Sequence, residues 1–233
     1  MDVTQVGAGP NANVDVQVDP TNQASRLSIR PTEHQLNNGS AQGGHYTTTF
    51  SYSNTAAKPT AGSDIVSMRW ALNNMFFVLK RLSVWVVTTT TYTATANQDI
   101  ALFKANGFSV AASAGTQVVP SSGPAQRARV SNMAATALGT GGGFLWISSG
   151  DLLTVGTRVL DTQGAGYFAY LNPITTVNQP QFGVLYEDRN TGQHPWVISA
   201  NEGFVIQTPI GNGQVAGVSK YTFVMEHMEV PAF

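Results

Sequence analysis

The chain has 233 residues, no cysteine and a formal net charge of −1, and only 11% of its residues are charged, against about 25% in ordinary soluble domains. The absence of cysteine excludes disulfides and thiolate metal sites, and the 42% hydrophobic content excludes general disorder. The near-neutral net charge does not indicate binding to nucleic acid or to an anionic membrane, which usually involves an excess of positive charge. A surface with so few charges must consist mainly of Thr, Ser, Asn, Gln and Gly, or be covered by other subunits.

The N-terminal segment is rich in Gly, Asn, Gln and Asp and contains one regular patch, in which Val14, Val16 and Val18 alternate with polar residues. This alternation predicts a short edge strand or an extended arm. We expect residues 1–44 to form an N-terminal arm and residues 45–233 to form a single β-sandwich domain, because all-β chains of this size often fold as one unit.

The first convincing strand is His45–Tyr52, in which aromatic and polar residues alternate. The segment Asp64–Trp70 has the same period and predicts a half-buried strand. The segment Met75–Ala96 is rich in β-branched residues but exceeds the usual strand length of about five or six residues, so we expect a long bent strand or a break near Arg81–Ser83. A helix over Ala71–Leu82 is the alternative.

Shorter strand-like segments follow, separated by clusters of turn residues. A turn at Asn106-Gly107 and a helical turn over Val130–Leu138, which Ser131 could cap, interrupt the series. The predicted strands are Asp99–Lys104, Phe144–Ser148, Leu152–Val155, Arg158–Leu160, Tyr167–Leu171, Phe182–Tyr186, Glu202–Gln207 and Tyr221–Val230. Many short strands and little helix predict an all-β fold, namely an antiparallel β-sandwich that is jelly-roll-like and carries an extended N-terminal arm.

The last predicted strand contains a change of pattern. Tyr221, Phe223 and Met225 share one face, after which the apolar phase shifts to Met228 and Val230. Such a shift predicts either a bulge or a strand that is covered on both faces. Because the chain has so few charges, we interpret this segment as a strand buried by its own sheet on one side and by a neighbouring subunit on the other.

No catalytic signature is present, since the chain lacks the G-x-S-x-G, H-E-x-x-H and phosphate-binding G-x-x-x-x-G-K-[ST] patterns. The weak metal candidates are His227 and Glu229, which share one face of a strand while Glu226 lies on the opposite face. Transition-metal sites usually need three or four converging ligands, so a structural His–carboxylate contact or a subunit-interface pair is the favoured interpretation. We expect no metal, no bound cofactor and no enzymatic activity.

Aromatic residues in the strands offer a second kind of candidate site. Trp146, Tyr167, Tyr170 and Trp196 could form a platform for a carbohydrate. Aromatic residues in strands are more often part of the core, because they contribute much of the apolar burial. A glycan-binding module is therefore an alternative interpretation.

Two groups of residues resemble the virion proteins of tailed bacteriophages. The C-terminal group consists of His194-Pro195, Asn201–Ile206, Thr222-Phe223 and Glu226, and the internal group consists of Met68–Ala71, Ala101–Ala105 and Phe108. The resemblance covers roughly residues 65–230 and is closest to head decoration, or cement, proteins.

The resemblance implies a non-enzymatic structural component of a bacteriophage virion, which binds the outer head surface as an oligomer and stabilises the contacts between capsomers. Its partners would be further copies of the chain, with a homotrimer favoured, and the major capsid protein of the same virion. The protein would lie on the capsid surface after assembly in the bacterial host cytoplasm, and neither nucleic acid nor a membrane is expected as a partner. The alternatives are a tail-fibre or receptor-binding β module and a jelly-roll coat protein. The residues expected at subunit interfaces are Val14, Val16, Val18, Glu226, His227 and Glu229.

Overall fold

The computed structural model describes residues 15–18, 25–28, 44–54, 60–93, 96–109, 115–117, 143–146, 153, 156–172, 180–188, 195–210 and 217–231. Within these residues the regular structure is entirely β and contains no helix. The strands are β1 (Asp15–Val18), β2 (Ser25–Ser28), β3 (Gly44–Ser53), β4 (Ser63–Arg69), β5 (Met75–Thr90), β6 (Ala96–Asn106), β7 (Thr116–Gln117), β8 (Gly143–Trp146), β9 (Val159–Leu160), β10 (Gly166–Asn172), β11 (Pro180–Glu187), β12 (Trp196–Ile198), β13 (Glu202–Thr208) and β14 (Val218–Pro231).

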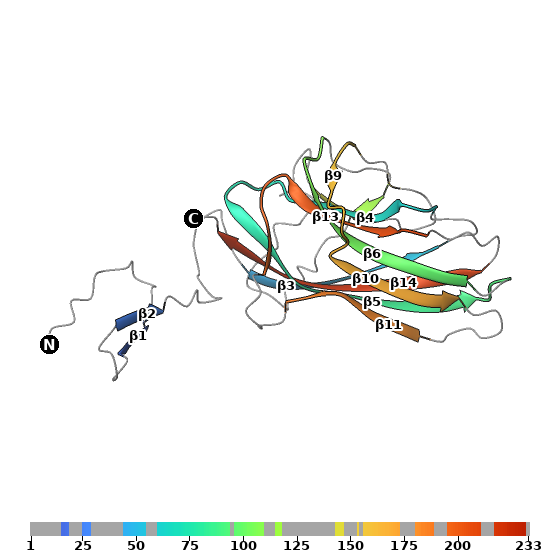
Figure 1. The fold of residues 1–233 in the computed structure, drawn as a ribbon, viewed down its shortest axis with the longest axis horizontal. Coiled ribbons are helices and arrows are strands. Elements are labelled where there is room, and N and C mark those ends of the chain that lie inside the picture. The colour runs from blue at the N-terminus through green and yellow to red at the C-terminus, as the bar shows by residue number, and fades with distance from the viewer. Residues whose placement is uncertain are drawn as a thin grey trace.

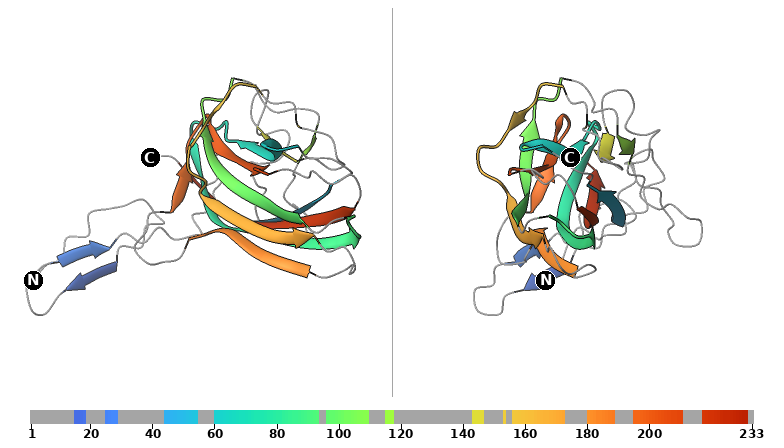
Figure 2. Two further views of the ribbon diagram at one scale, coloured as in Figure 1. Left: turned by 45° about the vertical axis from the view of Figure 1, so that its right-hand side comes forward. Right: turned by 90° about the vertical axis from the view of Figure 1, so that its right-hand side faces the viewer.

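Two antiparallel sheets form a sandwich (Figure 1). The five-stranded sheet has the order β11-β5-β14-β3, with β12 also paired to β5. The seven-stranded sheet has the order β10-β6-β13-β4-β8-β7, with β9 also paired to β6. Figure 2 shows the long strands of both sheets curving around a common interior. The predicted all-β sandwich is therefore confirmed.

The eight longest strands are paired like one long hairpin that has been rolled up. The first strand of this series, β3, pairs with the last, β14, and β4 pairs with β13. Further in, β5 pairs with β11, and β6 pairs with β10. The additional pairings of β5 with β14 and of β6 with β13 roll the hairpin into two sheets. This connectivity is that of a jelly roll, in which two sheets are built from eight strands.

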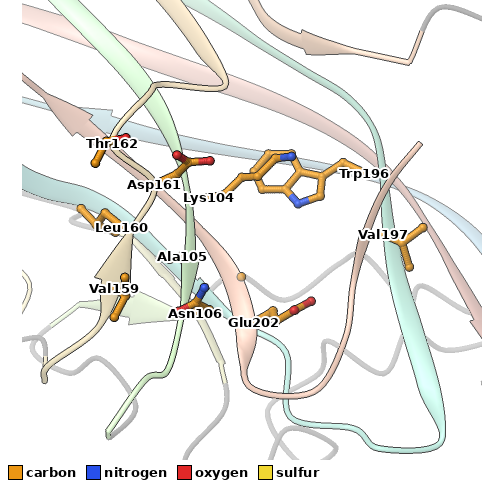
Figure 3. Close-up of a pocket in the computed structure, with 11 residues that line it drawn as sticks. Lys104, Ala105, Asn106, Val159, Leu160, Asp161, Thr162, Trp196, Val197 and Glu202 are labelled. Atoms are coloured by element: carbon orange, nitrogen blue, oxygen red, sulfur yellow. The ribbon is translucent and has the colours of Figure 1, made fainter. Parts of the chain in front are cut away.

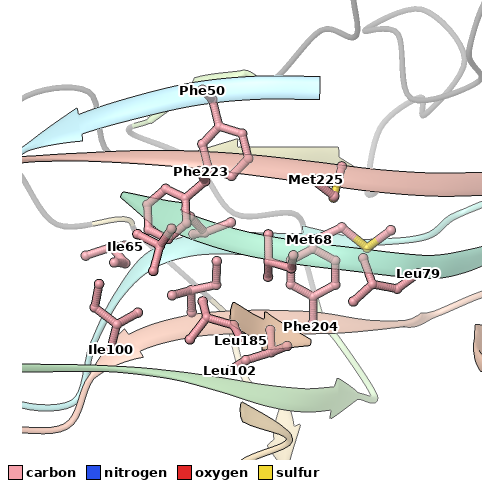
Figure 4. Packing of buried hydrophobic residues seen from close by; sticks show 14 of the residues in the cluster. Phe50, Ile65, Met68, Leu79, Ile100, Leu102, Leu185, Phe204, Phe223 and Met225 are labelled. Carbon is pink, nitrogen blue, oxygen red and sulfur yellow. The ribbon is translucent and has the colours of Figure 1, made fainter. Parts of the chain in front are cut away.

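The core lies between the two sheets and is rich in aromatic side chains (Figure 4). Cross-strand pairing places Phe50 of β3 beside Phe223 of β14, with ring centroids 5.1 Å apart. The next pair along the same two strands, Tyr52 and Tyr221, has centroids 5.4 Å apart. Aromatic residues at directly opposed positions of two strands stabilise the pairing, by about 0.2–1 kcal/mol per pair. The alternation in the sequence therefore becomes a ladder of rings on the inner face.

Two glycines allow the sheets to approach each other closely where β10 lies next to β11. A Cβ atom at Gly166 would lie 1.7 Å from the carbonyl oxygen of Leu185. A Cβ atom at Gly183 would lie 2.3 Å from Cδ2 of Phe168. Because any other side chain would collide at these positions, glycine permits this closure of the sandwich.

The helix considered over Ala71–Leu82 is wrong, because β5 runs as one strand from Met75 to Thr90. Its register with β14 shifts at two places, near the end of β5 between Val218 and Ser219 and in its middle between Glu226 and His227. At the second place Glu226 lies opposite Arg81 whereas His227 lies opposite Leu79. Lys80 is therefore the extra residue of a bulge. Pairing along almost the whole strand, together with the β-branched residues, explains why a length of 16 residues is maintained without a break.

The prediction that the segment Asp64–Trp70 is half-buried is wrong, because five consecutive residues of β4 are buried. The strand lies inside its sheet, between β13 and β8, and Ile65 is as fully buried as Val66 on the opposite face. A period of two residues identifies a strand, but it does not show how much structure covers the second face.

Some predictions concern residues with little or no description. The helical turn over Val130–Leu138 lies outside the described residues, as does most of the predicted strand Leu152–Val155. The strands β2, β7 and β12 were not predicted, because segments of four, two and three residues are too short for a clear alternation. Among the described residues, no helix has the length and apolar character needed to span a bilayer.

Candidate functional site

The last strand, β14, keeps a single alternation of buried and half-buried residues from Tyr221 to Val230, so the apolar residues change face at Met228 while the buried face stays the same. The predicted bulge is present in the pairing with β5, where the register shifts between Glu226 and His227. After Tyr221, Phe223 and Met225, the next buried residues on the same face are His227 and Glu229. Because these two residues are polar, the sequence pattern does not identify them as buried. Met228 and Val230 occupy the opposite, outer face and are half-buried. The side chains on the inner face are Tyr221, Phe223, Met225, His227 and Glu229.

The His227 ring lies inside the sandwich between two aromatic rings. Its centroid is 4.6 Å from that of Phe77 and 5.3 Å from that of Tyr46, and both pairs are stacked. Its Nε2 atom lies 3.5 Å from Oε1 of Glu229, and both side chains have no exposed surface. No group of three or more His, Cys, Asp and Glu residues that could hold a metal ion occurs in the described part of the chain.

The remaining predicted interface residues lie in three different places. Glu226 is half-buried on the outer face of β14, opposite Arg81 of β5 and Thr47 of β3. Val16 and Val18 belong to β1, which pairs with β2 to form a separate two-stranded sheet. Val14 lies outside the described residues. Their interface roles stay predictions.

The aromatic residues considered for a carbohydrate platform face different directions. Tyr167 and Tyr170 lie on opposite faces of β10, and the exposed fractions of their side chains are 59% and 4%. The Tyr170 hydroxyl forms a hydrogen bond with the Tyr221 hydroxyl in the core. Trp196 is buried against Tyr186. Trp146 belongs to β8 of the seven-stranded sheet, in which β6, β13 and β4 separate β8 from β10. Tyr167, Tyr170 and Trp196 therefore do not form one platform.

A pocket of about 530 Å³ lies between the end of β6, β9 and the beginnings of β12 and β13 (Figure 3). Lys104, Asp161, Trp196 and Glu202 are among its lining residues. The Lys104 ammonium lies 5.2 Å from the centre of the Trp196 ring, and Glu202 Oε2 accepts a hydrogen bond from the Ser199 N–H at 2.8 Å. Lys104 and Glu202 thus each interact with another part of the protein.

A buried ionic cluster connects the segment before β9 to the seven-stranded sheet. Asp64 Oδ1 accepts a hydrogen bond from Arg158 Nη2 at 2.6 Å and a second one from Gln207 Nε2 at 2.7 Å. Burial of Asp64 raises the pKa of its carboxyl group, although both partners act in the opposite direction. The cluster therefore holds Arg158 against β4 and β13.

The exposed feature that sequence reasoning missed is a set of apolar side chains on the outer face of the five-stranded sheet, here called the Trp85 patch. Its members are Trp85 of β5 and Phe182 and Val184 of β11, with exposed fractions of 45%, 43% and 37%. Phe182 lies directly opposite Trp85 in the register, and their ring centroids are 4.7 Å apart. The signal was present in the uninterrupted run Val84–Val87, because successive residues of a strand face opposite sides.

Comparisons with known proteins give no family assignment. No protein-family model matches the chain, and no curated protein matches it.

Three solved structures show distant similarity. The BFDV capsid protein, crystallised as a 60-mer, is 12% identical over 82% of this chain and 94% of its own, with a TM-score of 0.23. The VP2 subviral particle of infectious bursal disease virus is 13% identical over 94% of this chain and 46% of its own, with a TM-score of 0.13. The structure of the Gx strain of the same virus is 14% identical over 95% of this chain and 46% of its own, with a TM-score of 0.12. Similarities this weak do not define the fold, which is established by the strand pairings of the chain itself.

Proposed function

We propose that this chain is a non-enzymatic structural protein of a virion and acts as a jelly-roll coat subunit that assembles with further copies of itself. The observation that carries the proposal is the rolled-hairpin pairing of the eight long strands. Jelly rolls are found in viral capsid domains, lectin domains and cupins. Among these, a coat subunit agrees best with a chain that has only 11% charged residues and therefore has much surface suited to burial by neighbours.

Head decoration is the other virion role, and it would require a separate major capsid protein as partner. We favour a coat subunit because the jelly roll supplies a complete building block, whereas nothing in the described residues identifies a surface for a second kind of protein. The division into an arm of residues 1–44 and one β-sandwich domain of residues 45–233 belongs to this proposal. The arm would contact neighbouring subunits, and ordering it would cost about 1–2 kcal/mol per residue, so it would need many contacts.

The lectin-like alternative receives less support. Trp196 and Tyr170 are buried, and Tyr167 lies on the opposite face of β10 from Tyr170. A glycan-binding platform needs aromatic faces that are exposed together, so these side chains would have to rearrange. A glycan array with the purified chain tests this alternative directly.

The experiment that tests the proposed function is expression of the full chain alone, followed by sedimentation velocity and negative-stain electron microscopy. A coat subunit is expected to form closed particles of uniform size without any other viral protein. Small oligomers that bind only to preformed heads would instead identify a decoration protein. A chain that stays monomeric at every concentration and solution condition tested would contradict both virion roles.

A further inference from the structure

We infer that the Trp85 patch is a contact surface between two copies of this chain; this inference rests on the proposed function and specifies one interface of the assembly. The patch consists of Trp85, Phe182 and Val184 on the outer face of β5 and β11. Side chains at neighbouring positions of the same strands, such as Val84 and Leu185, point inward and are buried. The exposed apolar residues are thus not required for the core of the sandwich.

The composition of the outer face changes across the five-stranded sheet. On β3, at one edge, the outward positions carry Thr47, Thr49 and Ser51, which are suited to contact with water. On β5 and β11, at the opposite edge, the equivalent positions carry the two aromatic rings of the patch. Tryptophan is among the residues that most often dominate the binding energy of protein interfaces, and contiguous exposed apolar side chains mark such sites.

The charges beside the patch are of both signs. Arg81 Nε and Glu187 Oε1 lie 3.8 Å apart, and their side chains are 39% and 37% exposed. They belong to the same two strands as the patch, and Arg81 lies four residues before Trp85, which corresponds to roughly 13 Å along the strand. An apolar centre with a polar, charged rim is the usual arrangement of a protein interface.

A second copy of the chain is the occupant that fits this arrangement. A two-fold contact joins the same patch on both subunits, so the patch must be complementary to itself in shape and charge. One exposed cation and one exposed anion at its rim allow Arg81 of each copy to approach Glu187 of the other copy. A whole-chain charge of −1 also provides little repulsion between identical subunits. A glycan fits less well, because the Trp85 and Phe182 rings are tilted by 46° and do not share one plane.

The first test compares three forms of the full chain by sedimentation velocity over a range of concentrations. The patch variant Trp85→Ser/Phe182→Ser is expected to weaken self-association by about thirtyfold or more, the effect of losing a dominant interface residue. The control variant Tyr167→Ser/Leu171→Ser removes two exposed apolar side chains from β10 of the other sheet and is expected to assemble like the wild type. Circular dichroism and unfolding by denaturant verify that all three forms are folded.

The second test uses charge reversal and distinguishes a second copy from any other occupant. The variant Arg81→Glu gives the rim two anions, and the variant Glu187→Arg gives it two cations, so each alone is expected to associate less than the wild type. An equimolar mixture is expected to recover association, because an anionic rim then meets a cationic rim. Recovery in the mixture requires contact between two copies of this surface.

The possible results separate this inference from the proposed function. If the wild type does not assemble at all, the proposed function fails. If the wild type assembles and both the patch variant and the charge variants assemble equally well, the coat function stands and the assignment of this surface is overturned. Loss of glycan binding by the patch variant, with assembly unchanged, would also overturn it.

Discussion

Gly166 of β10 lies so close to Leu185 of β11 that a Cβ atom at residue 166 would be 1.7 Å from the Leu185 carbonyl oxygen. The contact is with backbone, which cannot swing away as a flexible side chain would. This pair therefore fixes how closely the two sheets meet along one side of the sandwich.

The first prediction is that Gly166→Ala destabilises the fold by about 2–3 kcal/mol, the upper range for overpacking in a well-packed interior. The measurement is the free energy of unfolding in urea. Gly164→Ala is the matched control, because the nearest atoms to a Cβ there are 3.6 Å away, which is ordinary van der Waals contact. Equal stability of the two variants would show that β10 and β11 can separate without loss.

The second prediction concerns Asp64, whose carboxyl pKa is raised by burial. A pKa above the unfolded value means that the folded state binds the proton more tightly, so this group stabilises the fold at low pH. That contribution is lost as pH rises from the unfolded pKa near 4 through the folded pKa. Asp64→Asn removes the titration, so its stability relative to wild type is expected to improve as pH increases across this range.

The measurement is urea unfolding of both proteins at several pH values from the acid side upward. The variant also replaces the carboxyl group that accepts hydrogen bonds from Arg158 and Gln207, which adds an offset to the stability difference, so the change of this difference with pH is the quantity that tests the prediction. Asp161→Asn, in which the original carboxyl is exposed, is the control for general effects of charge. A stability difference between Asp64→Asn and wild type that does not change with pH would contradict the prediction.

The third prediction concerns the hydroxyl groups of Tyr170 and Tyr221, which form a hydrogen bond to each other in the core. Tyr170→Phe and Tyr221→Phe are each expected to cost about 1–3 kcal/mol, because each leaves the other hydroxyl buried without this partner. The double variant is expected to cost less than the sum of the single variants. A double-mutant cycle on unfolding free energies measures the difference, and strict additivity would mean that the two hydroxyls are not coupled.

The fourth prediction is a loss of stability in alkali. Burial raises the pKa of Tyr52, Tyr170 and Tyr221 above the ordinary value near 10. Their protonated forms stabilise the fold below that pH, and this contribution is lost as pH rises further, because only the unfolded chain ionises easily. Ultraviolet difference absorbance is expected to show these phenols ionising together with unfolding. Gradual ionisation of every tyrosine in a folded protein would contradict the prediction.

Several elements of this fold could be recognised from local sequence. The alternation in His45–Tyr52 corresponds to β3, Gly44–Ser53, and that in Tyr167–Leu171 corresponds to β10, Gly166–Asn172. Where a turn was predicted at Asn106-Gly107, β6 ends at Asn106 and Gly107 has a positive φ of 63°. These features depend on the chemistry of adjacent residues, so a period of two residues or one glycine is enough to indicate them.

The candidate sites were much less accessible to sequence reasoning. His227 and Glu229 were correctly placed on one face of a strand, but only the aromatic rings of Phe77 and Tyr46 reveal that this face is the interior. Trp85 is the opposite case, because an aromatic residue within an apolar run resembles a core residue, whereas this one is 45% exposed.

The sequence by itself determined that the chain forms strands, where most of the long strands lie and that its surface has few charges. The tertiary structure alone decided that β3 pairs with β14, that Arg158 reaches Asp64, and which face of each strand is covered. The physical reason is that alternation is a local property, whereas burial depends on contacts between segments that are distant in sequence. The jelly-roll connectivity brings those segments together, and it leaves Trp85 and Phe182 on the outside.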